Sequence, residues 1–589
     1  MRNIFLLRYY FAVASLIIAA ISFGCGDGKR EDNSGMQFRA AKGGKFYGGT
    51  YRVNEVGDLR SLDPVGINDV TSHHIAHQVY DLLVDFDENL HLKPELAESW
   101  EISPDGLTYT YHLRKGVKFH DNLCFRGGKG REFTAGDVKY SFTRVCDART
   151  GTLGYDYFRG KVEGADAYYA ATQAAANGGA PAVKEVTGFI VKDEYTFQIR
   201  LTKPFAPFEN YAALGIAYIH PREAVEKYGR DFFQHPVGTG AFKFISWSPD
   251  RECILERNVN YWKTDADGNQ FPYLDKIHFS FIKDEKSQIF EFRGGNLEEC
   301  YRIPNEFFTS VVGEDKKLKG EYSKFQLLHL PAMSTQYYGM LTSSKEFSDV
   351  RVRRAFSMAV DRERIVKYVL KGQAYAAGTH GLVPPSMPDY QTENIKGYEF
   401  NPTTARALLA EAGYPNGVGL PPITLQLNNG GGRNLQIAEA AQAMIFENLG
   451  VKVSLTQVEF AKHLDEVDAG RAPFFRLGWV ADYPDPENFL NLLYGALVPE
   501  DGKPSPINHT RYRNAEFDKI FAQALSTNDR AARMKLYMQA EQIAMNDAPM
   551  IIVFYDEDYR LLAPYVEGYR NNAMDRRTYE YVWINPVKL

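Results

Sequence analysis

Hydrophobic and polar positions follow two different periods along the chain, in irregular succession. Residues 108–119, TYTYHLRKGVKF, alternate between apolar and polar side chains, which predicts a half-buried strand. Residues 71–83 and 348–370 carry apolar side chains at helical spacing, and each predicts one helix. This mixture of strands and helices predicts an α/β fold with mixed sheets.

Helix starts add local detail to this pattern. Thr134 and Asp137 have the spacing of a capping box, in which a hydroxyl and a carboxylate satisfy the free amides of a helix start. Asp485 precedes Pro486 in the stretch WVADYPDP, which predicts an N-cap and a helix over 486–494.

The first 25 residues are typical of an export signal. Positively charged Arg2 and Arg8 precede an apolar run over residues 11–23, which is short for a membrane span. The run ends at Cys25, and this end resembles the lipobox of bacterial lipoproteins, in which the signal is cut before an acylated cysteine. Ser22 and Phe23 depart from the usual lipobox residues.

We therefore expect a signal peptide over residues 1–24 and a lipid anchor on Cys25. A plain secretory signal with an incidental cysteine is the alternative. Residues 25–47 are rich in Gly, Lys, Asp and Ser with little periodicity, which predicts a flexible tether.

Four cysteines follow the signal, and an exported chain permits disulfides between them. Three pairings are possible. Proximity in the sequence favours Cys124–Cys146 and Cys253–Cys300. The sequence contains no CxxC, so it does not indicate a zinc ribbon or a redox motif.

Length and charge narrow the function. A chain of 589 residues predicts about three domains. The net charge is −6 and no long basic run occurs, which argues against nucleic acid as a partner. The sequence has no GxSxG, no phosphate-binding P-loop motif and no dinucleotide fingerprint, so we expect neither an enzyme nor a cofactor.

Nine segments occur in the order found in family-5 extracellular solute-binding proteins of ABC importers, which this chain resembles over more than 400 residues. They are LDP (62–64), LKPELAESW (92–100), YTYHLRKGVKFHD (109–121), FTAGDVKYSFTR (133–144), HPVGTGAFKF (235–244), ERNVNYWK (256–263), DVRVRRAFSMAVDRERIV (349–366), LLAEAGYP (408–415) and GWVADYPDPENFL (478–490). The segment 124–132 is longer than the turn that many members have there.

The resemblance implies a two-lobed periplasmic-binding-protein fold of class II, with three domains and a cleft between the lobes. The chain crosses between the lobes near residues 332 and 552, where a hinge is expected. The implied boundaries are 48–84, 200–332 and 552–589 for domain I, 85–199 for domain II, which is inserted in domain I, and 333–551 for domain III.

The resemblance also assigns a role to Asp482. In peptide-binding members the Asp of the W-x-x-D pattern lies in the cleft and pairs with the α-ammonium of the peptide. A carboxylate suits this role because charge-assisted hydrogen bonds are stronger than neutral ones. The alternative interpretation of Asp482 is a turn acid. The resemblance implies that the indole of Trp479 contacts a ligand side chain. The alternative, which is equally favoured, is that Trp479 is a residue of the hydrophobic core.

Four further residues fall near cleft positions of the family. Arg476 and Arg433 are candidates for the peptide carboxylate, although a surface arginine is the ordinary interpretation of each. Phe460 and Tyr555 are candidates for the cleft wall, although each taken alone is more typical of a core.

The expected function is capture of short peptides in the cleft and delivery to an ABC permease by a monomer. An oligosaccharide or a metal chelate is the alternative cargo. Two weaker hypotheses remain: a metal site on His73, His77 and Asp81, spaced at i, i+4 and i+8, and a glycosidase that uses Asp482 and Asp485. The proposed metal site lacks the glutamate of an HExxH motif. The glycosidase hypothesis requires Asp485 to act in catalysis in addition to its predicted role as a helix cap.

Overall fold

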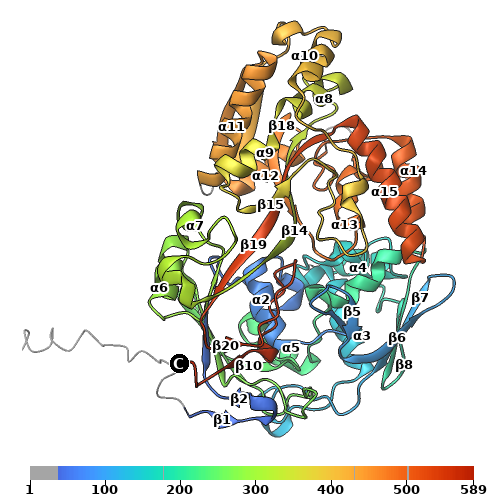
Figure 1. The fold of residues 1–589 in the computed structure, drawn as a ribbon. Coiled ribbons are helices and arrows are strands. Elements are labelled where there is room, and N and C mark those ends of the chain that lie inside the picture. The colour runs from blue at the N-terminus through green and yellow to red at the C-terminus, as the bar shows by residue number, and fades with distance from the viewer. Residues whose placement is uncertain (1–36, 177, 430–431, 501–502) are drawn as a thin grey trace, which may run out of the picture.

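The computed structural model describes residues 37–176, 178–429, 432–500 and 503–589. It has two lobes, and two long antiparallel strands, β14 (Gln326–Met340) and β19 (Met550–Leu562), run from one lobe into the other (Figure 1). Cys25 and the predicted signal peptide lie outside the described residues.

The lower lobe in Figure 1 contains two four-stranded sheets. One sheet has the order β10-β11-β12-β3, and its β3 runs parallel to β12 although the two are more than 200 residues apart in sequence. The other has the order β6-β7-β9-β8 and draws all its strands from residues 97–200. The strands are β3 (Thr50–Asn54), β10 (Phe242–Ser248), β11 (Glu252–Arg257), β12 (Lys276–Ser280), β6 (Ala97–Ile102), β7 (Thr108–Leu113), β8 (Phe189–Asp193) and β9 (Thr196–Arg200).

The helices of the lower lobe surround these sheets. The helix α2 lies near the middle of the molecule, below the strands that cross between the lobes (Figure 1). The lower-lobe helices are α2 (Val70–Val79), α3 (Ala135–Val145), α4 (Ala165–Ala174), α5 (Arg222–Tyr228), α6 (Glu285–Arg293) and α7 (Asn305–Val311). A short pair, β4 (Val84–Phe86) and β5 (Leu92–Pro94), follows α2.

The upper lobe is built on a mixed sheet of order β13-β19-β14-β18-β16-β17, in which β15 also pairs with β19. Its remaining strands are β13 (Glu299–Tyr301), β15 (Ala374–Ala377), β16 (Ile423–Asn428), β17 (Val453–Val458) and β18 (Phe474–Val480). Its helices are α8 (Val350–Ala359), α9 (Arg362–Arg364), α10 (Pro402–Glu411), α11 (Gly432–Leu449), α12 (Phe460–Asp468), α13 (Glu487–Leu490), α14 (Ala515–Leu525) and α15 (Arg530–Asp547). The short pair β20 (Val566–Glu567) and β21 (Trp583–Ile584) lies near the C-terminus.

Both crossings between the lobes lie within long strands: residue 332 is in β14 and residue 552 is in β19. The β14–β19 ladder is regular up to the pair Pro331–Glu557 and resumes at Thr335–Tyr555 after a shift in register. Such an irregularity bends a strand and interrupts its hydrogen bonds. The interruption lies at residues 331–335, beside the predicted hinge position 332.

Most of the predicted elements form, with one clear exception. Thr134 donates its backbone N–H to Asp137 at 2.9 Å, so the predicted capping box is confirmed. The single helix predicted over 348–370 is wrong, because the chain is extended at Val360. Asp361 then caps a new helix by accepting from the N–H of Arg364 at 3.0 Å. The side chain of an N-cap residue hydrogen-bonds to backbone N–H groups and thereby ends one helix and starts another. The spacing of hydrophobic residues does not reveal such a break.

The predicted disulfides are also wrong, because Cys124, Cys146, Cys253 and Cys300 are all free thiols. Cys253 lies on β11 within the large core cluster, which includes residues of both lobes, whereas Cys300 lies on β13 in a separate small cluster around α6 and α7. Proximity in sequence therefore does not bring these two thiols together. Burial raises the pKa of the Cys146 and Cys300 thiols, which keeps them protonated and unreactive.

Residues 37–47, which we expected within a flexible tether, form a hairpin of β1 (Arg39–Ala40) and β2 (Phe46–Tyr47). Lys45 Nζ lies 2.5 Å from Asp265 Oδ2, and the Tyr47 ring packs on Tyr273 at 5.3 Å between centroids. Within the residues that the structure describes, no helix combines the length and the apolar content needed to span a bilayer.

Candidate ligand-binding site

A cleft of about 1360 Å³ opens between the two lobes. The helices α6 and α7 border it from below, and α11, α12 and β18 border it from above (Figure 1). Residues from both long crossing strands contribute to its wall, so the cleft lies at the crossing between the lobes. The residues that line the cleft include Arg302, Gln336, Arg433, Phe460, Arg476 and Trp479.

A second, smaller cavity of about 340 Å³ lies next to this cleft. The helix α2 and the segment around Gly215 form its lower wall, and residues 480–482 form its upper wall. Val480 contributes to the walls of both spaces, which makes them neighbours. The stretch Trp479 to Asp482 thus separates a large cleft from a small cavity.

Asp482 lines the small cavity and not the large cleft. Asp482 is exposed to solvent by surface area, although many protein atoms lie around its carboxylate. Burial raises the pKa of this carboxyl, and the hydrogen bond from Asn488 partly offsets that rise. Among the described residues no Lys, Arg or His nitrogen lies within 4.0 Å of its carboxylate. A carboxylate that lines a cavity, is open to solvent and has no cation beside it can be reached by a cationic ligand group.

Asn488, on α13, holds the two residues of the W-x-x-D pattern in place. Its Oδ1 accepts from the Trp479 indole N–H at 2.8 Å and from the Asp482 backbone N–H at 3.1 Å. Its Nδ2 donates to Asp482 Oδ2 at 3.3 Å. Trp479 is half-buried at the end of β18, so its ring forms part of the cleft wall while its N–H is occupied.

The two predicted arginines both line the large cleft. Arg433 lies in the first turn of α11 and not in a loop, and its Nη2 pairs with Asp556 Oδ1 at 3.2 Å. Arg476 on β18 donates to the side chains of Gln336 and Asn428 and has no carboxylate within 4.0 Å among the described residues. Arg476 is therefore the better placed of the two to receive an anionic group.

The two predicted aromatic residues differ in position. Phe460, at the start of α12, is 50% exposed and lines the cleft. Tyr555 is 1% exposed in the core, and its hydroxyl donates to Gly381 O at 2.6 Å. The prediction of Tyr555 as a cleft residue is thus wrong, because its side chain points into the upper-lobe interior and not across the cleft.

Asp485 is fully buried and does not line either space. Its Oδ1 accepts from the Glu487 N–H at 3.0 Å, and its Oδ2 lies 3.4 Å from Arg533 Nη2. We predicted Asp485 as the N-cap of a helix over 486–494. Its bond to the Glu487 N–H lies at that helix start, but α13 covers only Glu487–Leu490 with Pro486 at its N-cap position, and a 3-10 turn continues to Leu493. No acid pair of Asp482 and Asp485 faces a substrate space, which removes the basis for a glycosidase.

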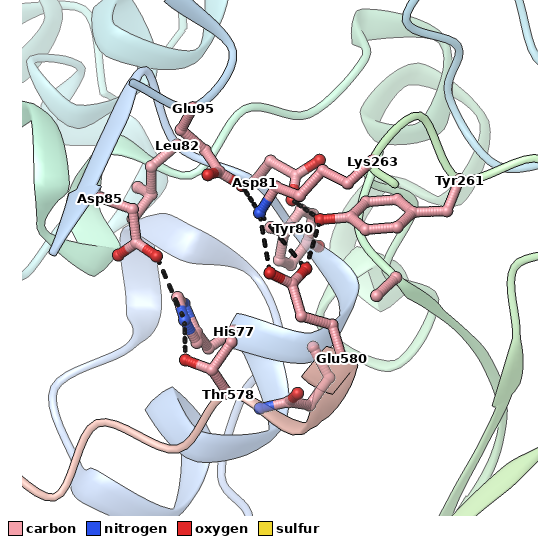
Figure 2. A pocket seen from close by; sticks show the side chains of 12 residues that line it. His77, Tyr80, Asp81, Leu82, Asp85, Glu95, Tyr261, Lys263, Thr578 and Glu580 are labelled. Carbon is pink, nitrogen blue, oxygen red and sulfur yellow. Dashed lines mark hydrogen bonds and ion pairs between the residues drawn. The ribbon is translucent and has the colours of Figure 1, made fainter. Parts of the chain in front are cut away.

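The histidines of the hypothetical metal site lie on α2, but Asp81 does not, because the helix ends at Val79. Asp81 instead accepts from Thr239, Tyr261 and Trp262 in a buried charged cluster around Lys263 and Glu580 (Figure 2). Within the part of the chain that the structure describes, no three His, Cys, Asp or Glu side chains are grouped to hold a metal ion.

The sequence did not reveal two residues of this site. In the sequence, Asn488 has no feature that distinguishes it from other residues near a helix start. Only its position in the folded chain shows that it connects Trp479 to Asp482. His73 lines the small cavity together with Asp482, whereas its helical spacing indicated only a metal ligand. The two residues are more than 400 positions apart in sequence, so only the folded chain places them at one cavity.

Comparisons with known proteins agree with this geometry. Residues 91–498 match the family described as bacterial extracellular solute-binding proteins, family 5. The chain is 32% identical over 522 residues to heme-binding protein A of Haemophilus influenzae, with 86% of this chain and 87% of the relative covered. It is 29% identical over 524 residues to the dipeptide-binding protein of Escherichia coli, with 86% and 89% covered.

Solved structures are similar as well. The periplasmic binding protein DppA from Helicobacter pylori, in complex with the peptide STSA, is 26% identical with a TM-score of 0.71, and 92% of this chain and 98% of that chain are covered. These similarities extend over both lobes, and the matched family covers the cleft-forming segments. The chain therefore belongs to the family-5 extracellular solute-binding proteins, with the two-lobed periplasmic-binding-protein fold.

Proposed function

We propose that this protein captures short peptides with a free amino terminus between its lobes and delivers them to the permease of an ABC importer. Asp482 receives the α-ammonium in the small cavity, and the rest of the peptide extends past Val480 into the large cleft. The protein acts as a monomer without a cofactor and breaks no bond in its cargo.

One observation carries this proposal: Asp482 lines the small cavity beside the cleft, and no cation of the described chain lies within 4.0 Å of its carboxylate. A ligand ammonium beside this carboxylate would gain a charge-assisted hydrogen bond, which is stronger than a neutral one. The proposed specificity for a free amino terminus follows from this pairing.

The other end of the ligand has a matching group in the cleft. Arg476 has no carboxylate within 4.0 Å among the described residues, and burial lowers the pKa of its guanidinium. A peptide carboxylate beside Arg476 would restore the charge balance there. Trp479 and Phe460 offer ring surface between the two charged ends.

A metal chelate is the competing cargo, because one relative at 32% identity is named for haem binding. A neutral oligosaccharide is a weaker alternative, since stacking on Trp479 and Phe460 needs no carboxylate at residue 482. Titration with haemin, followed by the Soret absorbance, separates the chelate from the peptide. The peptide proposal predicts no saturable spectral change at micromolar protein.

Isothermal titration calorimetry tests the peptide proposal directly. Wild-type protein, first stripped of any copurified ligand, is titrated with tri-alanine and then with N-acetyl-tri-alanine. Tight binding of the free peptide alone supports the proposal. Equal affinity for both peptides rejects it. Mass spectrometry of the copurified material identifies the natural cargo independently.

We also propose that Cys25 carries a lipid anchor at the outer face of a membrane and that the lobes meet at a hinge near residues 332 and 552. The hinge proposal rests on the interrupted β14–β19 ladder, and it keeps the domain boundaries given above. Cys25→Ser tests the anchor. The variant should move from the membrane to the soluble fraction on cell fractionation, and an unchanged distribution rejects the anchor.

A further inference from the structure

Two neutral side chains hold Arg476 in the wall of the large cleft. The Arg476 Nη2 donates to Gln336 Oε1, and its Nη1 donates to Asn428 Oδ1 at 3.2 Å. An arginine that is drawn into a protein is usually paired with a carboxylate, which accepts two parallel hydrogen bonds and cancels the charge. At Arg476 the two carboxamides fix the position of the guanidinium but do not cancel its charge.

Asp556 on β19 lines the same cleft, but other groups engage its carboxylate. Its Oδ2 accepts from Gln336 Nε2 at 2.7 Å and from Ser334 Oγ at 3.1 Å, and its Oδ1 pairs with Arg433 Nη2 at 3.2 Å. The Gln336 carboxamide therefore bonds to Asp556 through its nitrogen and to Arg476 through its oxygen. In this position it takes the place of a direct pair between the two opposite charges.

The backbone of β18 makes room for this carboxamide. Gln336 on β14 is paired in register with Gly478 on β18. A Cβ at residue 478 would overlap both the oxygen and the nitrogen of the Gln336 carboxamide. A glycine inside a strand often marks such a close approach. Gly478 thus lets the Gln336 side chain lie across the neighbouring strand, where it reaches Arg476.

We infer that Gln336 and Asn428 are neutral spacers that reserve the positive charge of Arg476 for a carboxylate of the ligand. This inference rests on the proposed peptide function and names the residues that set the preference for a free carboxylate. Gln336 and Asn428 are positioning residues whose neutrality matters as much as their hydrogen bonds. A carboxylate at either position would pair with the guanidinium inside the protein and leave no charge for the ligand.

Calorimetry with tri-alanine and tri-alanine amide tests this inference, because the two peptides differ only at the carboxyl end. The wild type should bind tri-alanine roughly tenfold more tightly than its amide, the factor expected of a hydrogen bond between charged groups. Gln336→Glu and Asn428→Asp are nearly isosteric, and each should reduce this preference to roughly onefold. Gln457→Glu, the same change at an exposed position on β17, should leave the preference unchanged, and thermal melts check folding.

Gln336→Met separates charge from orientation, since methionine fills a similar volume without a charge or a strong hydrogen bond. The preference should stay within about threefold of the wild-type value in this variant. An equal loss in Gln336→Met and Gln336→Glu would assign the effect to orientation alone and overturn the inference. An unchanged preference in both acidic variants would overturn it as well.

The same titrations distinguish failure of this inference from failure of the proposed function. If the wild type binds tri-alanine and its amide equally but still rejects N-acetyl-tri-alanine, the inference is wrong and recognition of the amino terminus by Asp482 stands. Failure of the wild type to bind any of these peptides rejects both.

Discussion

The side-chain amide of Asn488 donates to the Asp482 carboxylate at 3.3 Å and accepts from the Asp482 backbone N–H at 3.1 Å. One side chain thus fixes both the direction of the carboxylate and the turn that carries it. The same amide oxygen also holds the Trp479 indole. The W-x-x-D pattern therefore acts through a third residue, and its geometry depends on Asn488.

Asn488→Leu should weaken binding of a free-amino peptide roughly tenfold, because it keeps the side-chain volume but removes the bonds that orient Asp482. Calorimetry with tri-alanine measures this. Asn394→Leu, the same change at an exposed position, is the control and should leave the affinity unchanged. An unchanged affinity in Asn488→Leu would show that Asp482 is positioned without it.

Peptide affinity should fall as the pH is lowered, and it should begin to fall at a higher pH than for an ordinary aspartate. Burial raises the pKa of Asp482, and only the ionised carboxylate attracts an ammonium. Below that pKa the free protein must lose a proton before it binds. Calorimetry from pH 8 to pH 4.5 measures the profile. Asp482→Asn should bind weakly at every pH, and a parallel decline in both proteins would place the titration elsewhere.

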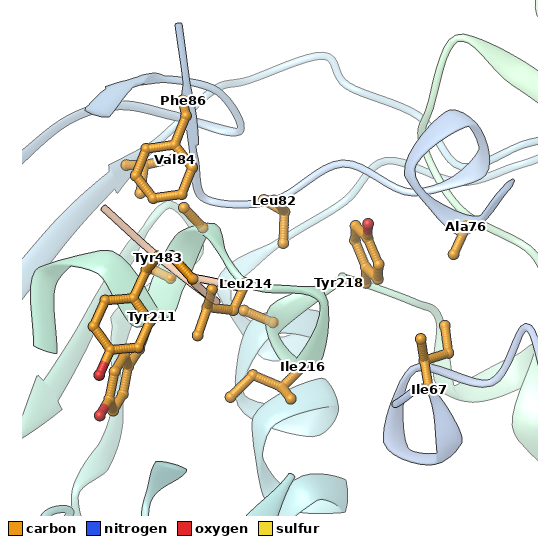
Figure 3. Packing of buried hydrophobic residues seen from close by; sticks show 14 of the residues in the cluster. Ile67, Ala76, Leu82, Val84, Phe86, Tyr211, Leu214, Ile216, Tyr218 and Tyr483 are labelled. Carbon is orange, nitrogen blue, oxygen red and sulfur yellow. The ribbon is translucent and has the colours of Figure 1, made fainter. Parts of the chain in front are cut away.

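Arg533 on α15 connects the lobes at a second place. Its Nη2 lies 3.4 Å from Asp485 in the upper lobe and 3.6 Å from Glu209 in the 3-10 helix Ala206–Ala213 of the lower lobe. Tyr211 and Tyr483 meet beside it with ring centroids 5.4 Å apart (Figure 3). These contacts join the two lobes in the arrangement that the structure shows.

Glu209→Gln should loosen closure, because it removes the interlobe charge but leaves the Arg533–Asp485 pair intact. We expect a larger radius of gyration for the unliganded protein in small-angle X-ray scattering and a few-fold loss of peptide affinity. Glu226→Gln, on the exposed face of α5, is the control. An unchanged radius and affinity would show that Glu209 does not bias closure.

Glu541 on α15 makes the upper lobe sensitive to pH. It accepts from the N–H groups of Leu382 and Val383 and from the Tyr390 hydroxyl, and burial raises its pKa to about 7 from 4.5. The folded state therefore holds a proton that the unfolded state releases between these values. The resulting contribution to stability is present below pH 4.5 and is lost as the pH rises to 7.

Glu541→Gln should remove that pH dependence, since a neutral amide can replace the protonated acid. The wild type should lose about 3 kcal/mol of unfolding free energy from this group between pH 4.5 and 7, whereas the variant should not. Urea denaturation at pH 5, 6, 7 and 8 measures the difference. Parallel profiles for the two proteins would contradict the role of Glu541.

The sequence predicts the family, the mixed sheets and the capping box, because these depend on local spacing or on motif order. It does not predict the break at Val360, where the capping side chain of Asp361 overrides the helical pattern. The sequence-based prediction also places Tyr555 in the cleft. In a strand that is covered on both faces, the residue pattern does not tell which face a given side chain occupies. The disulfides fail for a related reason, as nearness in sequence is not nearness in space.

For the site, the sequence indicates Asp482, Trp479, Arg476 and Arg433 but not their arrangement. That Asp482 and Arg476 face different spaces on either side of Val480 follows from the end of β18. His73 and Asp482 line the same small cavity although they are more than 400 positions apart in sequence. No local pattern marks such a pair, because only the folded chain brings the two residues to one cavity.

The most direct test compares free and N-acetylated tri-alanine on the wild type and on Asp482→Asn by calorimetry. The account predicts that acetylation weakens binding to the wild type by roughly a hundredfold and that the variant binds both peptides equally weakly. Asp465→Asn, at an exposed carboxylate on α12, should keep the wild-type discrimination. Tight binding of the acetylated peptide to the wild type would contradict the account.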